Sequence, residues 1–344
     1  MADTMNYTRL GQVDLSGDAL ALFKDQFIPE LLTQFDAKRV ARNYVRHKTI
    51  TKGKSASFPI LGKTGAKYYT VGDAPLLGNQ TIAHNEVTIN LDPYLVSDIL
   101  IHDLDEKMQE YDDRAEIVTE MARALANTED KQILQVGVLA ARAAAKIKGG
   151  NGGSVIKGGA TVATDGAKLA AALFAANVKL DEKDVPEEDR TLFVKPLQYA
   201  LLAQYVNVID RNIGAGSYAL GETGKIDKTT IIKTNNLPCT NIEQESGTHP
   251  NNIYYGDFSN TVALLMNKQA VATVSRAGLK TEVAWKLEHL SHLIVARVLQ
   301  GHGIIRPEAA VEISSTEETT TSTTPSGSTS ATGGTGTEGD SSGN

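Results

Sequence analysis

The sequence contains a single cysteine, Cys239. One thiol excludes an intrachain disulfide and the zinc sites that need several cysteines, and we interpret it as a buried structural thiol. No stretch approaches the roughly 18 consecutive apolar residues of a membrane-spanning helix. The polar start, Met1 to Asp14, contains no apolar run followed by a cleavage site. We therefore expect no secretory signal and no membrane segment. We also expect the protein to be made and used in a reducing compartment.

An excess of positive charge is also absent. The 344 residues carry a formal net charge of −7, and the pI is about 5.6. This balance argues against a protein whose main task is to coat phosphates through a basic surface. The hydrophobic fraction of 41% is high enough for two or three compact units with real cores.

The stretch from Asp103 to Lys146 predicts one long amphipathic helix. Apolar or small side chains recur every three or four residues from Leu104 to Leu125, and again from Ile133 to Ile147. Between them, near Asn127 and Thr128, the apolar stripe shifts around the helix, and we expect a bend there. We expect Gly149-Gly150 to end the helix. Its length would be about 65 Å, which is typical of a strut between parts of a protein.

Before this helix the pattern predicts an arm and a hairpin. Residues Ala19 to Phe35 suggest a helix with four apolar side chains on one face, which packs on another part of the chain or on a neighbour. These side chains are Phe23, Phe27, Leu31 and Phe35. The segment from His47 to about Gln80 suits a long two-stranded hairpin, which needs a surface to lie on. Its candidate contact residues are Phe58, Pro59, Ile60, Leu61, Lys63, Tyr68 and Tyr69.

Two further strands, Val87 to Leu91 and Leu95 to Ile101, precede the long helix, and a glycine-rich connector follows it. Alternating helices and strands over residues 151–275 predict an α/β domain. The strands Thr281 to Leu287 and His292 to Leu299 should pair with the strands before the helix, which would make the first domain discontinuous. From Ser314 onward the chain is almost entirely Ser, Thr, Gly, Glu and Asp, and it cannot bury enough apolar surface to fold.

Chemical motifs are weak. Gly53-Lys54-Ser55 and Gly62-Lys63-Thr64 resemble the end of a phosphate-binding loop, but its first glycine is missing in both. His289 and His292, three apart, do not match the zinc-protease spacing. The acids between Asp103 and Asp113 spread over the polar face of the predicted helix, where a solvated face or intersubunit ion pairs are favoured over a metal site. The sequence therefore predicts no active site, no cofactor and no bound metal.

Five blocks, taken together and in order, resemble the major capsid proteins of T-seven-like short-tailed bacteriophages. They are residues 53–64 (GKSASFPILGKT), 98–105 (DILIHDLD), 111–114 (YDDR), 185–190 (VPEEDR) and 301–310 (GHGIIRPEAA). The resemblance covers roughly residues 20 to 313.

The resemblance implies the α+β tailed-phage capsid fold. Its expected parts are an N-terminal arm (1–46), an extended hairpin loop that overlaps a neighbour (47–85), a peripheral domain with a long spine helix (86–150 and 276–313), an axial α/β domain (151–275) and a disordered tail (314–344). Some members of the wider fold crosslink a hairpin lysine to a neighbour, for which Lys54, Lys63 and Lys67 are available. T-seven-like relatives are not known for this reaction.

The implied function is structural and not enzymatic. Copies of the chain would form hexamers and pentamers of an icosahedral virion shell around double-stranded DNA, which the inner face contacts non-specifically. A scaffolding protein and a portal protein are the implied partners, and assembly would take place in the host bacterial cytoplasm. The alternative is an encapsulin-like cellular nanocompartment of the same fold, which would enclose a protein cargo.

Overall fold

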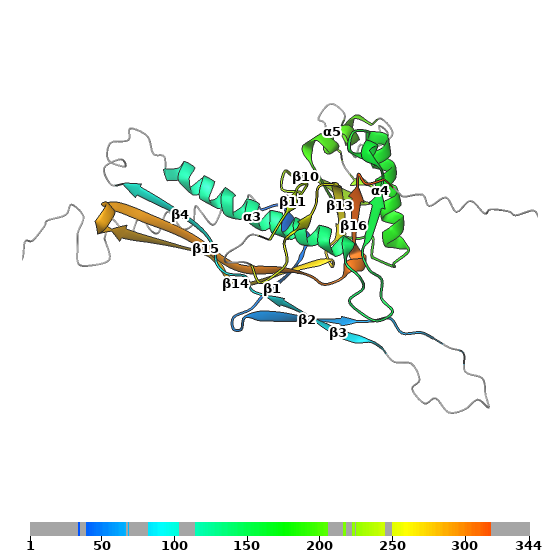
Figure 1. The fold of residues 1–344 in the computed structure, drawn as a ribbon, viewed down its shortest axis with the longest axis horizontal. Coiled ribbons are helices and arrows are strands. Elements are labelled where there is room, and N and C mark those ends of the chain that lie inside the picture. The colour runs from blue at the N-terminus through cyan, green and yellow to red at the C-terminus, as the bar shows by residue number, and fades with distance from the viewer. Residues whose placement is uncertain are drawn as a thin grey trace, which may run out of the picture.

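The computed structural model describes residues 34, 39–66, 68, 82–102, 114–205, 216–217, 222–223, 225–244 and 250–317. Two sheets lie at different ends of an elongated molecule, one long helix runs between them, and a hairpin projects below (Figure 1). The predicted arm residues Phe23, Phe27, Leu31 and Phe35 lie outside the described residues. The same holds for Lys67, Tyr69, residues 103–113 and residues 318–344.

The long helix is α3, Arg114–Arg142, with 29 residues. The predicted start lies outside the described residues, and the predicted end at Lys146 is wrong. The chain turns back after Arg142, and the Gly153 N–H bonds to the Ala143 carbonyl at 2.9 Å. A side chain at Gly153 would place its Cβ 2.2 Å from the Ala141 carbonyl oxygen. The helix therefore ends where the returning strand covers its last turn, well before the glycine pair at 149–150.

The shift of the apolar stripe is confirmed, because α3 contributes to two separate cores. Its first half packs on the outer part of one sheet through residues that include Val118, Met121 and Leu125. Its second half lies in a larger core with both sheets through Ile133, Leu134 and Val138, among others. Between the two halves the helix stays continuous (Figure 1).

One sheet has four strands in the order β1-β14-β15-β4. Their bounds are β1 Arg46–Thr49, β14 Val271–Lys286, β15 Ser291–Ile304 and β4 Leu95–His102. The antiparallel pairing of β15 with β4 confirms the predicted return of the chain to the strand before the helix. The assignment of residues 47–49 to the hairpin is wrong, because they belong to β1, which pairs in parallel with β14.

The hairpin consists of β2, Ser55–Leu61, and β3, His84–Asn90, paired antiparallel from Ser55↔Asn90 to Leu61↔His84. The segment Val87 to Leu91, expected as a separate strand, is therefore largely the returning strand of the hairpin. Its alternation is real, since Ile89 is buried while its neighbours Thr88 and Asn90 are exposed.

The second sheet is mixed and has the order β5-β16-β13-β6-β10-β9. Its strands are β5 Ser154–Lys157, β16 Ala310–Ser314, β13 Thr261–Asn267, β6 Arg190–Val194, β10 Thr229–Lys233 and β9 Lys225–Ile226. Helices α4, Gly166–Asp181, and α5, Pro196–Gln204, pack beside it. The last strand, β16, joins this sheet and not the four-stranded one, because it pairs with β13 and β5.

The remaining short elements complete the chain. Two-residue strands form the pairs β7 with β8 and β11 with β12, and short 3-10 helices stand at turns. Their bounds are η1 Ala41–Tyr44, η2 Ala160–Ala163, η3 Leu287–His289, η4 Pro307–Ala309, β7 Gly216–Ser217, β8 Glu222–Thr223, β11 Asn241–Ile242 and β12 Gly256–Asp257. Among the helices that the structure describes, none is long and apolar enough to cross a membrane.

Candidate assembly surfaces

The inner face of the hairpin packs on the chain's own four-stranded sheet. Phe58 and Ile60 are each 5% exposed and share a small core with Ile89, Ala272 and Val274. The ammonium group of Lys48 lies 5.1 Å from the centre of the Phe58 ring. Phe58 and Ile60, predicted as contacts to a neighbour, are thus occupied within the chain. The alternation of a strand explains this, because every second residue of β2 faces the sheet.

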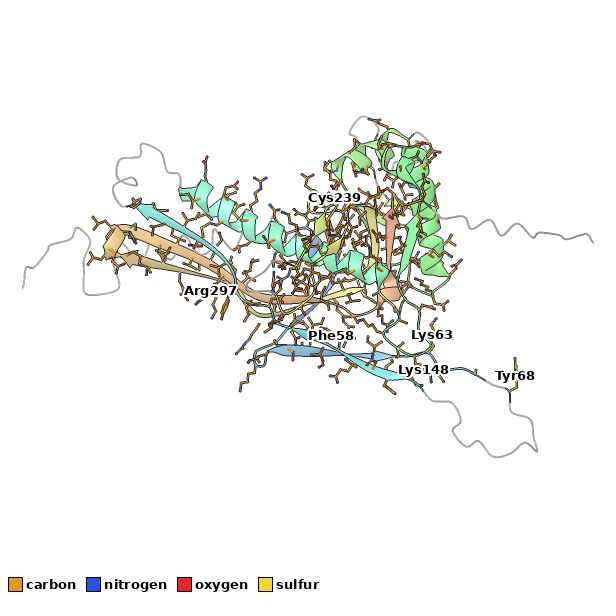
Figure 2. All side chains as sticks on the ribbon, viewed as in Figure 1. Phe58, Lys63, Tyr68, Lys148, Cys239 and Arg297 are labelled. Carbon is orange, nitrogen blue, oxygen red and sulfur yellow. The ribbon has the colours of Figure 1, made fainter. Side chains whose placement is uncertain are left out.

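The other predicted hairpin residues that the structure describes face outward. Leu61 is 59% exposed, Tyr68 is fully exposed, and Pro59 and Lys63 are exposed as well. Lys63 forms an ion pair with Asp184 of its own chain. Figure 2 shows Lys63 and Tyr68 toward the free end of the hairpin, away from Phe58. A surface for a neighbouring molecule therefore remains on this side of the hairpin.

A buried carboxylate pair on α3 anchors the segment that enters from the N-terminal side. Asp130 accepts hydrogen bonds from the backbone N–H groups of Val40 at 3.0 Å and Ala41 at 2.9 Å. Glu129 accepts one from the Arg42 guanidinium at 3.3 Å, and Arg39 lies 3.6 Å away. Both acids are fully buried, and burial raises the pKa of each carboxyl group.

Sequence reasoning missed this anchor. Its signal was present as two acids in the gap of the apolar stripe, directly after Asn127 and Thr128. The gap reads as a bend if the stripe alone is followed. In the structure, this gap separates the part of α3 that packs in the smaller core from the part that packs in the larger core. The two acids in the gap bind the chain segment that crosses the helix there.

A second polar cluster fastens the loop before β12 to the connection between β3 and β4. The Tyr254 hydroxyl donates to Asp92, and the Asn252 N–H donates to the same carboxylate at 3.1 Å. The backbone N–H of His302 donates to the Tyr254 hydroxyl oxygen at 3.0 Å. Burial raises the pKa of Asp92 and lowers the pKa of His302 to about 3. The imidazole of His302 is therefore neutral, and its Nδ1 lies 2.9 Å from the Thr273 hydroxyl.

The weak chemical motifs do not converge. Within the described residues, no group of three or more His, Cys, Asp or Glu side chains is placed to hold a metal ion. His292 packs edge-on against Trp285, with ring centres 4.7 Å apart, and His289 stands in the adjoining turn. Cys239 is only half-buried and lies beside the Lys195 ammonium, so the expectation of a buried thiol is wrong. Gly62-Lys63-Thr64 follows a hairpin strand and leads to no helix in the described part.

An elongated subunit with a spanning helix, two sheets and a projecting hairpin is the architecture of the capsid shell proteins of tailed phages. The capsid structure of the cyanophage P-SCSP1u is similar, with 36% identity and a TM-score of 0.73 over 81% of this chain and 88% of that one. The mature capsid of bacteriophage PhiM1 shares the fold at 17% identity, with a TM-score of 0.65 over 80% and 86% of the two chains.

The family model of the Gp10A-like major capsid proteins matches residues 57–314. The major capsid protein of Escherichia phage T7 is 30% identical over 318 residues, which are 86% of this chain and 92% of that protein. The chain therefore belongs to the Gp10A-like major capsid protein family and is a major capsid protein of a tailed phage. This confirms the identification made from the five sequence blocks, and it favours a phage capsid over a cellular nanocompartment.

Proposed function

We propose that copies of this chain form hexamers and pentamers that close into an icosahedral head around double-stranded DNA. The observation that carries the proposal is the family match over residues 57–314 in a chain whose hairpin leaves apolar side chains unburied. Shells of this kind gain stability by multiplying modest contacts, since each subunit touches several neighbours at once. Weak single contacts also permit correction while the shell grows.

The four-stranded sheet with α3 would be the peripheral domain, and the six-stranded sheet with α4 and α5 the axial domain around the ring centres. The hairpin would overlap an adjacent copy with Pro59, Leu61, Lys63, Tyr68 and Tyr69. The arm side chains Phe23, Phe27, Leu31 and Phe35 would pack on a neighbour. The support is the order of these parts along the chain, which matches the expected order of the fold.

The partners in the proposal are a scaffolding protein during assembly, a portal protein at one vertex and the packaged DNA. Assembly would take place in the host bacterial cytoplasm, and the chain would act without enzymatic activity. A net charge of −7 supports loose contact with DNA, because a mostly acidic wall does not hold phosphates tightly.

The test is expression of the protein alone and with a candidate scaffolding protein, followed by electron microscopy and light scattering. Closed uniform shells are the expected result, and their five-fold and six-fold rings would be visible in averaged images. A small monodisperse species under both conditions would contradict the proposal.

A further inference from the structure

The inner part of the four-stranded sheet carries a polar layer on the face opposite the hairpin. The strand register of β1, β14 and β15 places six polar side chains in two adjoining rows of this face, which are His47, Thr273, His302, Thr49, Ser275 and Gln300. The opposite face of the same strands carries Ala272 and Val274, which pack on the hairpin. Gln300 reaches Glu129 of α3, so the polar layer lies where the sheet passes under the gap between the two cores of that helix (Figure 1).

Arg42 joins this polar layer to α3. One terminal nitrogen of its guanidinium group donates to Oε1 of Glu129 at 3.3 Å. The other terminal nitrogen lies 3.1 Å from Nε2 of His47 on β1. Arg42 belongs to η1, the part of the crossing segment that follows the two backbone N–H groups held by Asp130. A single side chain therefore connects the crossing segment, the helix and the sheet.

The contact with Arg42 fixes the protonation state of His47. A guanidinium group offers only donors, so Nε2 of His47 has to be the acceptor, and the imidazole is neutral with its proton on Nδ1. The hydroxyl groups of Thr49 and Ser275 each lie 3.2 Å from the same nitrogen. A hydroxyl group can reverse its hydrogen bond when Nε2 gains a proton, but Arg42 cannot. Protonation of His47 therefore breaks the contact with Arg42 selectively.

The charges around the imidazole act in the same direction. Partial burial, followed by the positive charges of Arg42 and Arg39, lowers the pKa of His47, and among the described residues no carboxylate contributes to this shift. His302 in the same row is fully buried, and its pKa is about 3. Of the two histidines in the layer, His47 thus takes up its proton first as the pH falls. Its residue is exposed overall, so a proton reaches the ring without opening of the fold.

We propose that the contact between His47 and Arg42 is a proton-sensitive latch for the segment that crosses α3. Neutral His47 holds the Arg42 guanidinium against Glu129, and protonated His47 releases it, so that the segment from residue 39 through η1 detaches more often. The arm predicted at Ala19 to Phe35 directly precedes this segment in the sequence. The latch would therefore control how firmly the arm is tied to its own subunit.

Docking of the segment should weaken as the pH falls below about 6.5, the ordinary pKa of histidine. The pKa of His47 is lowered while the segment is docked and returns toward this value when the arginines move away, so the detached state binds more protons in this window. The effect is limited to about tenfold per pH unit. Burial raises the pKa of Glu129 and Asp130, and these acids favour docking as the pH falls once water reaches them in the detached state. A loss of docking on mild acidification therefore points to a histidine.

The test is amide hydrogen exchange at Ala41 in the unassembled full chain, at about pH 7.5 and about pH 5, with each rate divided by the intrinsic rate at that pH. The corrected rate of the parent should rise by about threefold to thirtyfold at the lower pH. His47→Gln keeps an acceptor oxygen but does not titrate, so it should abolish the rise. The matched control is His84→Gln, which changes an exposed histidine on β3 and should leave the rise unchanged.

Arg42→Gln supplies the second measurement. An amide can reverse its hydrogen bond, so this variant should tolerate protonated His47 and lose the rise although His47 is intact. Absence of the rise in the parent would refute the latch. A rise that persists in His47→Gln would assign the pH dependence to another group such as His302, and one that persists in Arg42→Gln would exclude Arg42 as the released group. All these contacts lie within one chain, so a failure to form shells would count against the proposed function and not against the latch.

Discussion

Removal of the Asp130 carboxylate should release the crossing segment from α3. In the Asp130→Ala variant, the N–H groups of Val40 and Ala41 lose their acceptors, and no other acceptor for them is present in the described structure. Ala41 is only 1% exposed, so water does not replace the lost bond without local opening. The segment from residue 39 through β1 should therefore detach more often than in the parent chain.

The size of the effect follows from two hydrogen bonds to a charged acceptor. Each contributes about 1.5–3 kcal/mol, which gives about 3–6 kcal/mol for the pair. The cost of burying the charged carboxylate, which its raised pKa indicates, offsets part of this stabilisation. The net loss of stability of the docked segment in Asp130→Ala should be about 2–4 kcal/mol. Hydrogen exchange at the Ala41 amide should then accelerate by roughly thirtyfold to a thousandfold.

The assay is amide hydrogen exchange of the unassembled chain, with Lys131→Ala as the control because Lys131 is the exposed neighbour. Asp130→Asn keeps one acceptor oxygen and should give an intermediate rate. Unchanged exchange at Val40 and Ala41 in Asp130→Ala would refute the role of this carboxylate as the anchor.

Four further outcomes are expected. Phe58→Ala should weaken the docking of the hairpin on its own sheet by about 3–5 kcal/mol. Trypsin should then cleave faster at Lys54, with little change in the melting temperature of the rest of the chain. Unchanged cleavage would contradict the packing of Phe58 within its own chain. Gly137→Ala should lower the melting temperature by several degrees, because its Cβ would stand 2.6 Å from a Leu264 methyl carbon; a rise would mean that helix propensity outweighs packing there. The pKa of His302 is about 3 in the folded chain and about 6.5 in the unfolded chain. Between these two pH values the unfolded chain therefore binds more protons. The free energy of unfolding should fall by up to roughly 1.4 kcal/mol per pH unit as the pH drops through this window. The variant His302→Asn should show a smaller slope, and an equal slope would exclude His302 as its source. Truncation after residue 317 should leave shell formation in electron micrographs unchanged, whereas loss of shells would give the tail a role in assembly.

The truncation point shows where composition alone misplaced a boundary. A tail was expected from Ser314, but Ser314 closes β16, and the Ser315 N–H bonds to the Asn260 carbonyl at 2.8 Å. The Gly159 N–H also bonds to the Thr316 carbonyl at 3.1 Å. Ser and Thr side chains gave no sign of this, because backbone pairing depends on a neighbouring strand and not on the residues themselves.

Elements with a clear local period were predictable. The strand before the helix, predicted as Leu95 to Ile101, was found close to its observed bounds, since apolar spacing is set by the element's own geometry. Pairing between distant strands was harder. The parallel partner of β1 lies more than 220 residues away, and no local pattern marks it.

The sequence predicted that the hairpin carries the contacts to a neighbour, but it did not distinguish the outward face of the hairpin from the face that packs on the chain's own sheet. Phe58 and Ile60 lie on the face of β2 that packs on the chain's own sheet, whereas the equally apolar Leu61 points the other way. Leu61 and Tyr68 are exposed, and their contact with a neighbouring copy stays a prediction. Which face is free depends on a sheet whose strands come from residues 271–304, far along the chain.

Helix α3 has a consequence for how the subunit loses its structure. In the part of the chain that the structure describes, the two sheets share no hydrogen-bonded strands, which would ordinarily allow each to melt at its own temperature. One continuous helix, however, supplies side chains to the cores of both. Loss of either core removes support from a helix that the other core needs, so the two sheets are coupled into one cooperative unit. The free subunit should therefore give a single heat-absorption peak in calorimetry.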